Sequence, residues 1–246
     1  MRDAILTTLA VGEKYTTLVA PCLRETVAAG NAALVVTDRP ADFAGIDVEI
    51  VRYEPEMSSL FHAKRHAVRA GLARAWTVYF MDADHRVRAR PMPHGDPLLP
   101  RLPVGASAHF HMQPITQIEF NYAGGLSIKD QERQLDTAAA ALDLPSWRDA
   151  TWWGDWLFAV TRNTEDDSGK WLLFCETWDR FARWSAAEGC SELAFGDGVA
   201  LAWAAHACGW RPQRRTASFV HITSTFQHLM AGDWKEKFVQ AKQNRG

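Results

Sequence analysis

Apolar residues follow two alternating patterns along the first 81 residues of the chain. Short runs of β-forming residues predict strands, and apolar positions that recur every three or four residues predict helices. Gly30-Asn31 ends the first predicted helix, and Asp38-Arg39-Pro40 ends the second predicted strand. Strands that alternate with helices of this length predict βαβ units and a largely parallel sheet. The predicted strands are 5–10, 33–37, 48–53 and 76–81, and the predicted helices are 16–29 and 59–74.

The pattern changes in the second half of the chain. Five prolines between residues 88 and 105 predict a long irregular segment. No repeat or low-complexity tract follows, so we expect one α/β domain over residues 1–246, with a mixed, mostly parallel central sheet flanked by helices. The later predicted strands are 107–112, 153–161 and 217–223, and the later predicted helices are 130–142, 171–188, 197–208 and 233–242.

Composition limits the class of protein. The chain has 246 residues, 47% of them apolar, which is enough for a large core. A net charge of −2 argues against a nucleic-acid-binding protein that relies on bulk charge, while a local basic groove is left open. The four cysteines form no CxxC pair and predict reduced thiols in a cytoplasmic protein; they are residues 22, 175, 190 and 208.

The chain also shows no sign of a membrane span or a secretion signal. No apolar stretch approaches the ~20 residues that a span requires, and Asp3 and Glu13 flank the short apolar run near the N-terminus. Peripheral membrane attachment and the oligomeric state are left open. Tryptophan is frequent, with 11 residues against four tyrosines. Its rings either fill a core or stack on sugars, and both interpretations are kept.

The most informative segment is residues 76–87, Trp-Thr-Val-Tyr-Phe-Met-Asp-Ala-Asp-His-Arg-Val. A buried strand runs directly into Asp82 and Asp84, whose side chains share one face of an extended chain. Ligands bind beyond the carboxyl ends of the strands in open α/β sheets, so the two carboxylates are predicted to hold Mn²⁺ or Mg²⁺. Such a cation needs further oxygen ligands, which a substrate diphosphate supplies. The alternative is a surface turn in which Asp is simply common.

The order of elements before this Asp-Ala-Asp motif resembles the GT-A fold of glycosyltransferases. Residues 61–87, beginning Phe-His-Ala-Lys-Arg, are similar to the segment that precedes the DxD motif in ABO blood-group-type and glycogenin-type enzymes. The resemblance implies a Rossmann-like domain and transfer of a sugar from a UDP- or GDP-sugar to a hydroxyl acceptor, itself a carbohydrate. It also implies a nucleotide-sugar-binding half over 1–90, an acceptor-side half over 91–230 and a C-terminal helix or tail over 231–246.

The resemblance assigns a role to each matching position. It implies that Asp84 is the main metal ligand and Asp82 the supporting one, with His221 as the third ligand and His228 as its replacement. Asp197 opens a late predicted helix, and the resemblance implies that it is the base that deprotonates the acceptor in an inverting enzyme or a contact to the acceptor or donor sugar in a retaining one. An N-cap role is the alternative. The implied donor-binding residues are Thr8, Leu9, Ala10, Asp38, Lys64, Arg65 and Ala83, and the implied acceptor-binding residues are Trp153, Gly154, Asp155 and Trp156. For Lys64 and Arg65, a solvated helix face is the alternative.

Three other interpretations are kept beside this one. A sugar-1-phosphate nucleotidyltransferase has a similar sheet, but its Gly-rich loop is absent from residues 10–17, which hold one glycine. A non-catalytic module that binds nucleotide or carbohydrate would use the same pocket without turnover. His109 and His111 share a strand face that suits zinc, although no third ligand is evident in the sequence.

Overall fold

Helices and strands alternate along the first part of the chain in the predicted order. The computed structural model describes residues 1–56, 60–87, 113–114, 128–152, 156–162, 168–188, 197–210 and 226–228. The strands are β1 (Arg2–Ala10), β2 (Ala33–Thr37), β3 (Glu49–Arg52), β4 (Ala75–Met81), β5 (His85–Val87), β6 (Gln113–Pro114), β7 (Thr151–Trp152), β8 (Leu157–Thr161) and β9 (Phe226–His228). The helices are α1 (Glu13–Ala28), α2 (Leu60–Leu72), α3 (Ile128–Leu142), α4 (Ser168–Ala187) and α5 (Asp197–Ala207), with short 3₁₀ turns η1 (Pro40–Phe43) and η4 (Trp147–Asp149).

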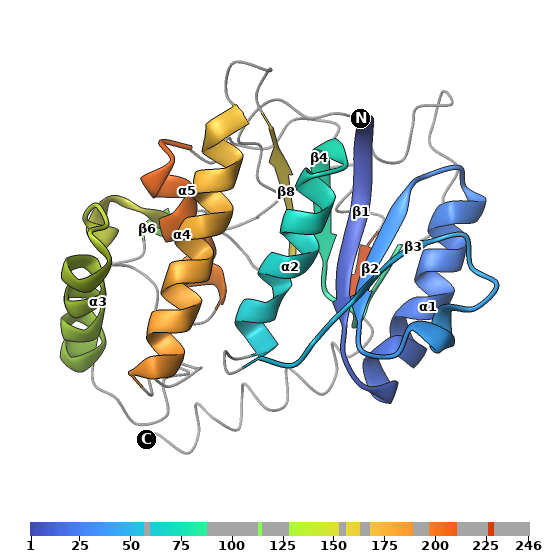
Figure 1. Cartoon of the computed structure of the whole chain (residues 1–246), viewed down its shortest axis with the longest axis horizontal. Helices are drawn as coiled ribbons and strands as arrows, with labels where there is room; N and C mark the ends of the chain where they lie inside the picture. Colours follow the sequence, from blue (N-terminus) through green and yellow to red (C-terminus); the bar gives the residue numbers. More distant parts are fainter. Residues whose placement is uncertain are drawn as a thin grey trace.

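The central sheet has five strands in the order β3-β2-β1-β4-β8. Figure 1 shows them side by side, with α2 on the side of the sheet that faces the viewer. The first four strands are parallel, and β8 is antiparallel to β4. The fold is therefore α/β, with a mixed, mostly parallel and Rossmann-like sheet flanked by helices, as the sequence predicts.

The strand order reverses direction between β1 and β4. From β1 the chain moves outward to β2 and β3, then crosses back through α2 to place β4 on the other side of β1. Right-handed crossovers therefore place α1 and α2 on opposite faces of the sheet. Thr7 is aligned with Phe80, and Ala10 with Thr37, so the carboxyl ends of three strands lie at one edge. A reversal of this kind opens a crevice beyond the strand ends, where α/β proteins bind ligands.

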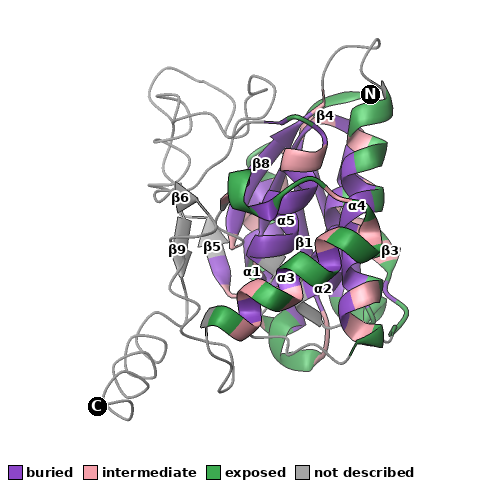
Figure 2. Ribbon diagram, turned by 90° about the vertical axis from the view of Figure 1, so that its left-hand side faces the viewer, coloured by how far each residue is buried: buried purple, intermediate pink, exposed green. Residues whose placement is uncertain are grey.

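The tryptophans of the second half contribute to the core. Trp147, Trp178 and Trp203 are among the largest fully buried side chains, and Figure 2 shows that most of the central sheet is buried, apart from the edge strand β3 and the start of β1. For these three rings the core interpretation is confirmed, because a fully buried ring offers no face to a sugar. Cys22, Cys175 and Cys208 are also buried, and none forms a disulfide within the described part of the chain.

Some predicted boundaries differ from those observed. The strand predicted over 153–161 is observed only from Leu157, as β8, and β5 and β9 were not predicted at all. The predicted strands 107–112 and 217–223 and the predicted helix 233–242 lie outside the described residues. Among the described residues, no helix is long and apolar enough to cross a membrane.

Gly71 allows α2 to lie close to the sheet. A β-carbon at this position would lie 2.6 Å from Cγ2 of Thr7 and 2.8 Å from Cγ2 of Val78. Both neighbours are β-branched residues of buried strands, so their χ1 angles are restricted and the added methyl group is not easily accommodated. We expect Gly71→Ala to lower the free energy of unfolding by about 1–3 kcal/mol, measured by urea denaturation.

Gly169 provides the matched control. It lies exposed in α4, and a β-carbon there would meet no atom within 4 Å. Gly169→Ala should leave the free energy of unfolding unchanged or raise it by up to about 1 kcal/mol, because alanine is the better helix former. Equal stability of the Gly71→Ala variant and the wild type would contradict the close packing of α2 on the sheet.

Candidate functional site

Asp82 and Asp84 lie directly after β4, where the strand order reverses. The seven residues of β4 are buried or nearly so, and the chain turns as soon as it leaves the strand. The backbone N–H of Asp82 donates to the carbonyl of Trp156 (2.8 Å), and the N–H of His85 donates to the carbonyl of Asp82 (3.0 Å). These bonds hold a tight turn at the edge where the sheet predicts a ligand site.

Three side chains of this turn form one cluster. Asp82, Asp84 and His85 each offer a ligand atom, and these atoms lie within 4.8 Å of one another. His85 Nδ1 lies 2.9 Å from Asp84 Oδ1, and the imidazole is buried, whereas the carboxylates of Asp82 and Asp84 are 25% and 23% exposed. Two carboxylates and an imidazole suit a divalent cation such as Mn²⁺. His85 was not among the ligands that the sequence predicted.

Lys64 brings a positive charge into the cluster from α2. Its Nζ lies 2.8 Å from Oδ1 and 3.1 Å from Oδ2 of Asp82. The side chain is only 11% exposed, and the ammonium lies 5.7 Å from the centre of the Phe80 ring. The burial of Lys64 contradicts a solvated helix face and places its ammonium beside the first aspartate of the motif, while donor binding by Lys64 stays a prediction.

Arg65, the next residue of α2, makes different contacts. Its guanidinium donates to Asp179 of α4, to Glu56 and to the carbonyl of His62. The side chain is almost fully buried in this set of ion pairs, which joins α2 to α4. These contacts suit a structural role, and donor binding by Arg65 stays a prediction.

Trp156, the residue directly before β8, packs against the cluster. Its ring stacks on the imidazole of His85, with centroids 4.8 Å apart and planes 16° from parallel. Its carbonyl also accepts the hydrogen bond from Asp82. Trp156 therefore fixes two residues of the cluster at once. The other predicted acceptor residues, Trp153, Gly154 and Asp155, lie outside the described residues.

The structure describes the backbone of His228 and of Asp197 but not His221. In the antiparallel pair β5–β9, His228 is aligned with His85, so its backbone lies beside the cluster. His221 lies outside the described residues. The backbone of Asp197 begins α5, but the position of its side chain is not among the described parts of the structure.

The predicted donor residues of the first part of the chain lie in the second half of β1 and directly after β2. Thr8 and Ala10 are fully buried and Leu9 is partly buried. In the described part of the chain the Thr8 hydroxyl has no hydrogen-bond partner. The backbone N–H of Gly12 donates a hydrogen bond to Oδ1 of Asp38 (2.9 Å), and Gly12 itself has a φ of 82°. This bond ties the end of β2 to the loop after β1. Ala83, in the turn itself, is buried.

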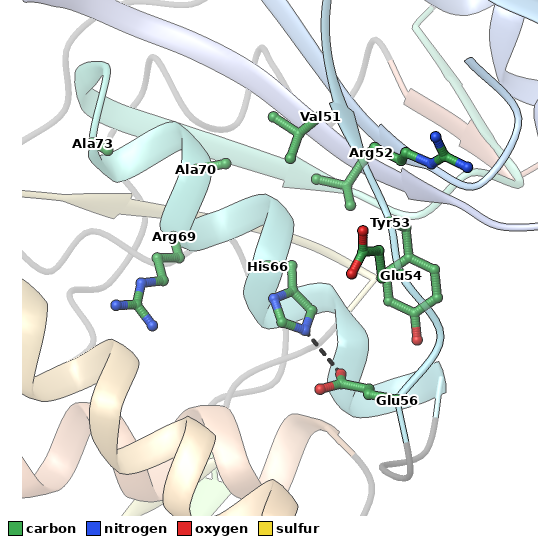
Figure 3. Close-up of a pocket in the computed structure, with 10 residues that line it drawn as sticks. Val51, Arg52, Tyr53, Glu54, Glu56, His66, Arg69, Ala70 and Ala73 are labelled. Carbon is green, nitrogen blue, oxygen red and sulfur yellow. Dashed lines mark hydrogen bonds and ion pairs between the residues drawn. The ribbon is translucent and has the colours of Figure 1, made fainter. Parts of the chain in front are cut away.

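A separate pocket of about 390 Å³ lies between β3 and α2 (Figure 3). Glu56 forms one side of the pocket, and its Oε1 lies 2.8 Å from Nε2 of His66. Burial, together with the nearby charge of Glu56, raises the pKa of Tyr53. None of the predicted site residues lines this pocket. Its lining residues are Val36, Val51, Arg52, Tyr53, Glu54, Glu56, His66, Arg69, Ala70 and Ala73.

No protein-family model matches the sequence, and no curated protein sequence matches it. The resemblance to GT-A glycosyltransferases therefore stays a prediction, and the function is argued from the geometry of the Asp82–Asp84–His85 cluster.

Proposed function

We propose that this protein is a metal-dependent glycosyltransferase. It moves a sugar from a nucleoside-diphosphate donor to a hydroxyl group of an acceptor. The observation that carries the proposal is the cluster of Asp82, Asp84 and His85 in the turn after β4, where the strand order reverses. This position combines cation ligands with the crevice in which α/β sheets bind nucleotides.

The ligand set supports a cation that works together with a diphosphate. Asp84 and His85 hold Mn²⁺ or Mg²⁺ in this proposal, with Asp82 beside them. These side chains are fewer than the six positions of an octahedral shell, so waters and phosphate oxygens complete it. When bound, the cation offsets the negative charge that develops on the departing nucleoside diphosphate.

The donor half of the site is assigned to the ends of β1 and β2. β1 lies between β2 and β4, so the ends of all three strands share one edge of the sheet, and the Asp38–Gly12 hydrogen bond shapes the loop between β1 and α1. The nucleoside of a UDP- or GDP-sugar would lie over these strand ends, with its phosphates toward the metal cluster. The buried Thr8 hydroxyl, which lacks a partner in the described part of the chain, lies under this region.

The acceptor half of the site is assigned to residues just before β8 and to the first residue of α5. Among the predicted acceptor residues, Trp156 lies in the described part of the chain, where its ring stacks on the ring of His85 in the cluster. Asp197, at the start of α5, is assigned as the base that takes the proton of the acceptor hydroxyl. Trp147, Trp178 and Trp203 are core residues, so sugar stacking is assigned to Trp153 and Trp156 only.

The cysteines fit an enzyme of the cytoplasm. Cys22, Cys175 and Cys208 form no disulfide in the described part of the chain. Burial raises the pKa of the Cys175 thiol to about 12, so this thiol stays protonated and unreactive near neutral pH. Buried, reduced thiols are typical of proteins in a reducing compartment.

The direct experiment is a screen for donor turnover. The protein is incubated with Mn²⁺, a panel of UDP- and GDP-sugars and a mixture of sugar acceptors, and released UDP or GDP is measured. We expect release with one donor and none after EDTA is added. Formation of pyrophosphate from a sugar phosphate and a nucleoside triphosphate would indicate a nucleotidyltransferase instead. Tight nucleotide binding without turnover across the panel would indicate a binding module.

A further inference from the structure

Lys64 forms an ion pair inside the cluster that we assign to the metal. Its ammonium lies 2.8 Å and 3.1 Å from the two carboxylate oxygens of Asp82. We propose, on the basis of the proposed function, that Lys64 is an internal cation that competes with the metal for Asp82. When the metal binds, the ammonium leaves Asp82 and turns to the diphosphate of the donor.

The surroundings of Lys64 explain why it stays at Asp82 when no metal is bound. The side chain is 11% exposed and extends from the buried face of α2 across the Phe80 ring. A cation removed from water in this way requires an anion beside it. Asp82 provides that anion, and its backbone is fixed by the hydrogen bond to Trp156.

The same geometry opposes joint binding of the ammonium and a metal ion at Asp82. The ligand atoms of Asp82, Asp84 and His85 lie within 4.8 Å of one another, so an ion among them would lie close to the ammonium. Like charges at this distance in a partly buried site repel strongly enough to change an affinity by tenfold or more. The metal therefore binds first through Asp84 and His85, and it gains Asp82 only when Lys64 moves.

A donor diphosphate allows the metal ion and the Lys64 ammonium to bind at the same time. Its oxygens approach the metal, and they carry the negative charge that the displaced ammonium requires. Lys64 then contacts a phosphate, as lysine does at many phosphate sites. Metal and donor thus each raise the affinity of the other, and the coupling is the same in both directions. In this arrangement Lys64 also keeps the metal weakly held until the donor arrives.

Removing the charge of Lys64 tests this competition. Mn²⁺ affinity is measured by electron paramagnetic resonance on the full chain, for the wild type, Lys64→Met and the control Lys129→Met, whose lysine is exposed on α3. We expect Lys64→Met to bind Mn²⁺ about tenfold more tightly than the wild type in the absence of nucleotide. The same variant should bind UDP or GDP about tenfold more weakly in the presence of Mn²⁺. Lys129→Met should match the wild type in both measurements.

The outcomes separate this inference from the proposed function. If the wild type binds Mn²⁺ and Lys64→Met binds it no more tightly, Lys64 does not compete and the inference is overturned, while the metal site stands. If neither protein binds Mn²⁺, the metal site of the proposed function fails and the inference fails with it. Binding by Lys64→Met alone supports the inference, and the wild type is then expected to bind Mn²⁺ only when UDP or GDP is also present.

A second measurement uses the wild type and therefore does not depend on the folding of a variant. Lysines are acetylated briefly with acetic anhydride, and the labelling of Lys64 is compared with that of Lys129 by mass spectrometry. We expect Mn²⁺ to raise the labelling of Lys64 several-fold, because the ammonium leaves Asp82, and addition of UDP or GDP to lower it again. Unchanged labelling of Lys64 at saturating Mn²⁺ would overturn the inference.

Discussion

Replacing Asp84 by Asn is expected to weaken Mn²⁺ binding by about 100-fold or more and to abolish Mn²⁺-dependent turnover. The change removes a negative charge from a partly exposed ligand while keeping the size of the side chain. Asp84 also accepts the hydrogen bond of His85 at 2.9 Å, so the same carboxylate orients a second ligand. Mn²⁺ affinity, measured by electron paramagnetic resonance, and the rate of UDP or GDP release together test this prediction.

Asp136→Asn is the matched control for Asp84→Asn. Asp136 also accepts hydrogen bonds from neighbouring side chains, those of Trp147 and Arg148, and these bonds hold its pKa below the usual range. It lies on α3 and takes no part in the cluster, so its replacement should leave Mn²⁺ affinity unchanged. A folded Asp84→Asn variant that binds Mn²⁺ as tightly as the wild type would remove Asp84 from the metal site.

Replacing Asp197 by Asn is expected to lower turnover by about 10²- to 10⁴-fold, the usual effect of losing a general base. Nucleotide binding in the presence of Mn²⁺ should be unchanged, because Asp197 is assigned to the acceptor and not to the donor. The melting temperature should also stay the same, since Asn stabilises the start of a helix about as well as Asp. Turnover with saturating donor, UDP affinity and thermal melting are the three measurements.

These three measurements also separate the two interpretations of Asp197. Asp197→Ala removes both the base and the helix-end interaction, so it should lower turnover as Asn does and lower stability by about 1 kcal/mol in addition. Full turnover in the Asn variant combined with lower stability in the Ala variant would assign Asp197 to the start of α5 only.

The first half of the fold is predictable because buried parallel strands leave a clear pattern. Strands covered by helices on both faces form continuous apolar runs, so β2 and β4 are visible without any alignment. The Asp82-x-Asp84 motif is predictable for the same reason, since carboxylates directly after such a run must lie at the end of the sheet. The helix that leads into this strand is predictable as well, but the sequence does not show that Lys64 on it is buried beside Asp82.

The features of the site that the sequence did not predict depend on contacts between residues far apart in the chain. His85 follows Asp84, so strand alternation alone would place it on the opposite face from both aspartates. The turn after β4 and the ring of Trp156, which comes much later in the chain, bring it into the cluster. Arg65 likewise looks identical to Lys64 by position, yet its partner Asp179 lies 114 residues away. The periodicity of the sequence cannot predict an ion pair between residues so far apart.

The most direct test of the central claim is the melting temperature of the wild type with UDP or GDP, measured with Mn²⁺ and again with EDTA. A ligand at 100 times its Kd stabilises the folded state by about 2.7 kcal/mol, which raises the Tm of a chain of this length by about 5–10 °C. We predict a rise of this size with one of the nucleotides in Mn²⁺ and none in EDTA. No rise with either nucleotide, or an equal rise in EDTA, would contradict a nucleoside-diphosphate site built on Asp82, Asp84 and His85.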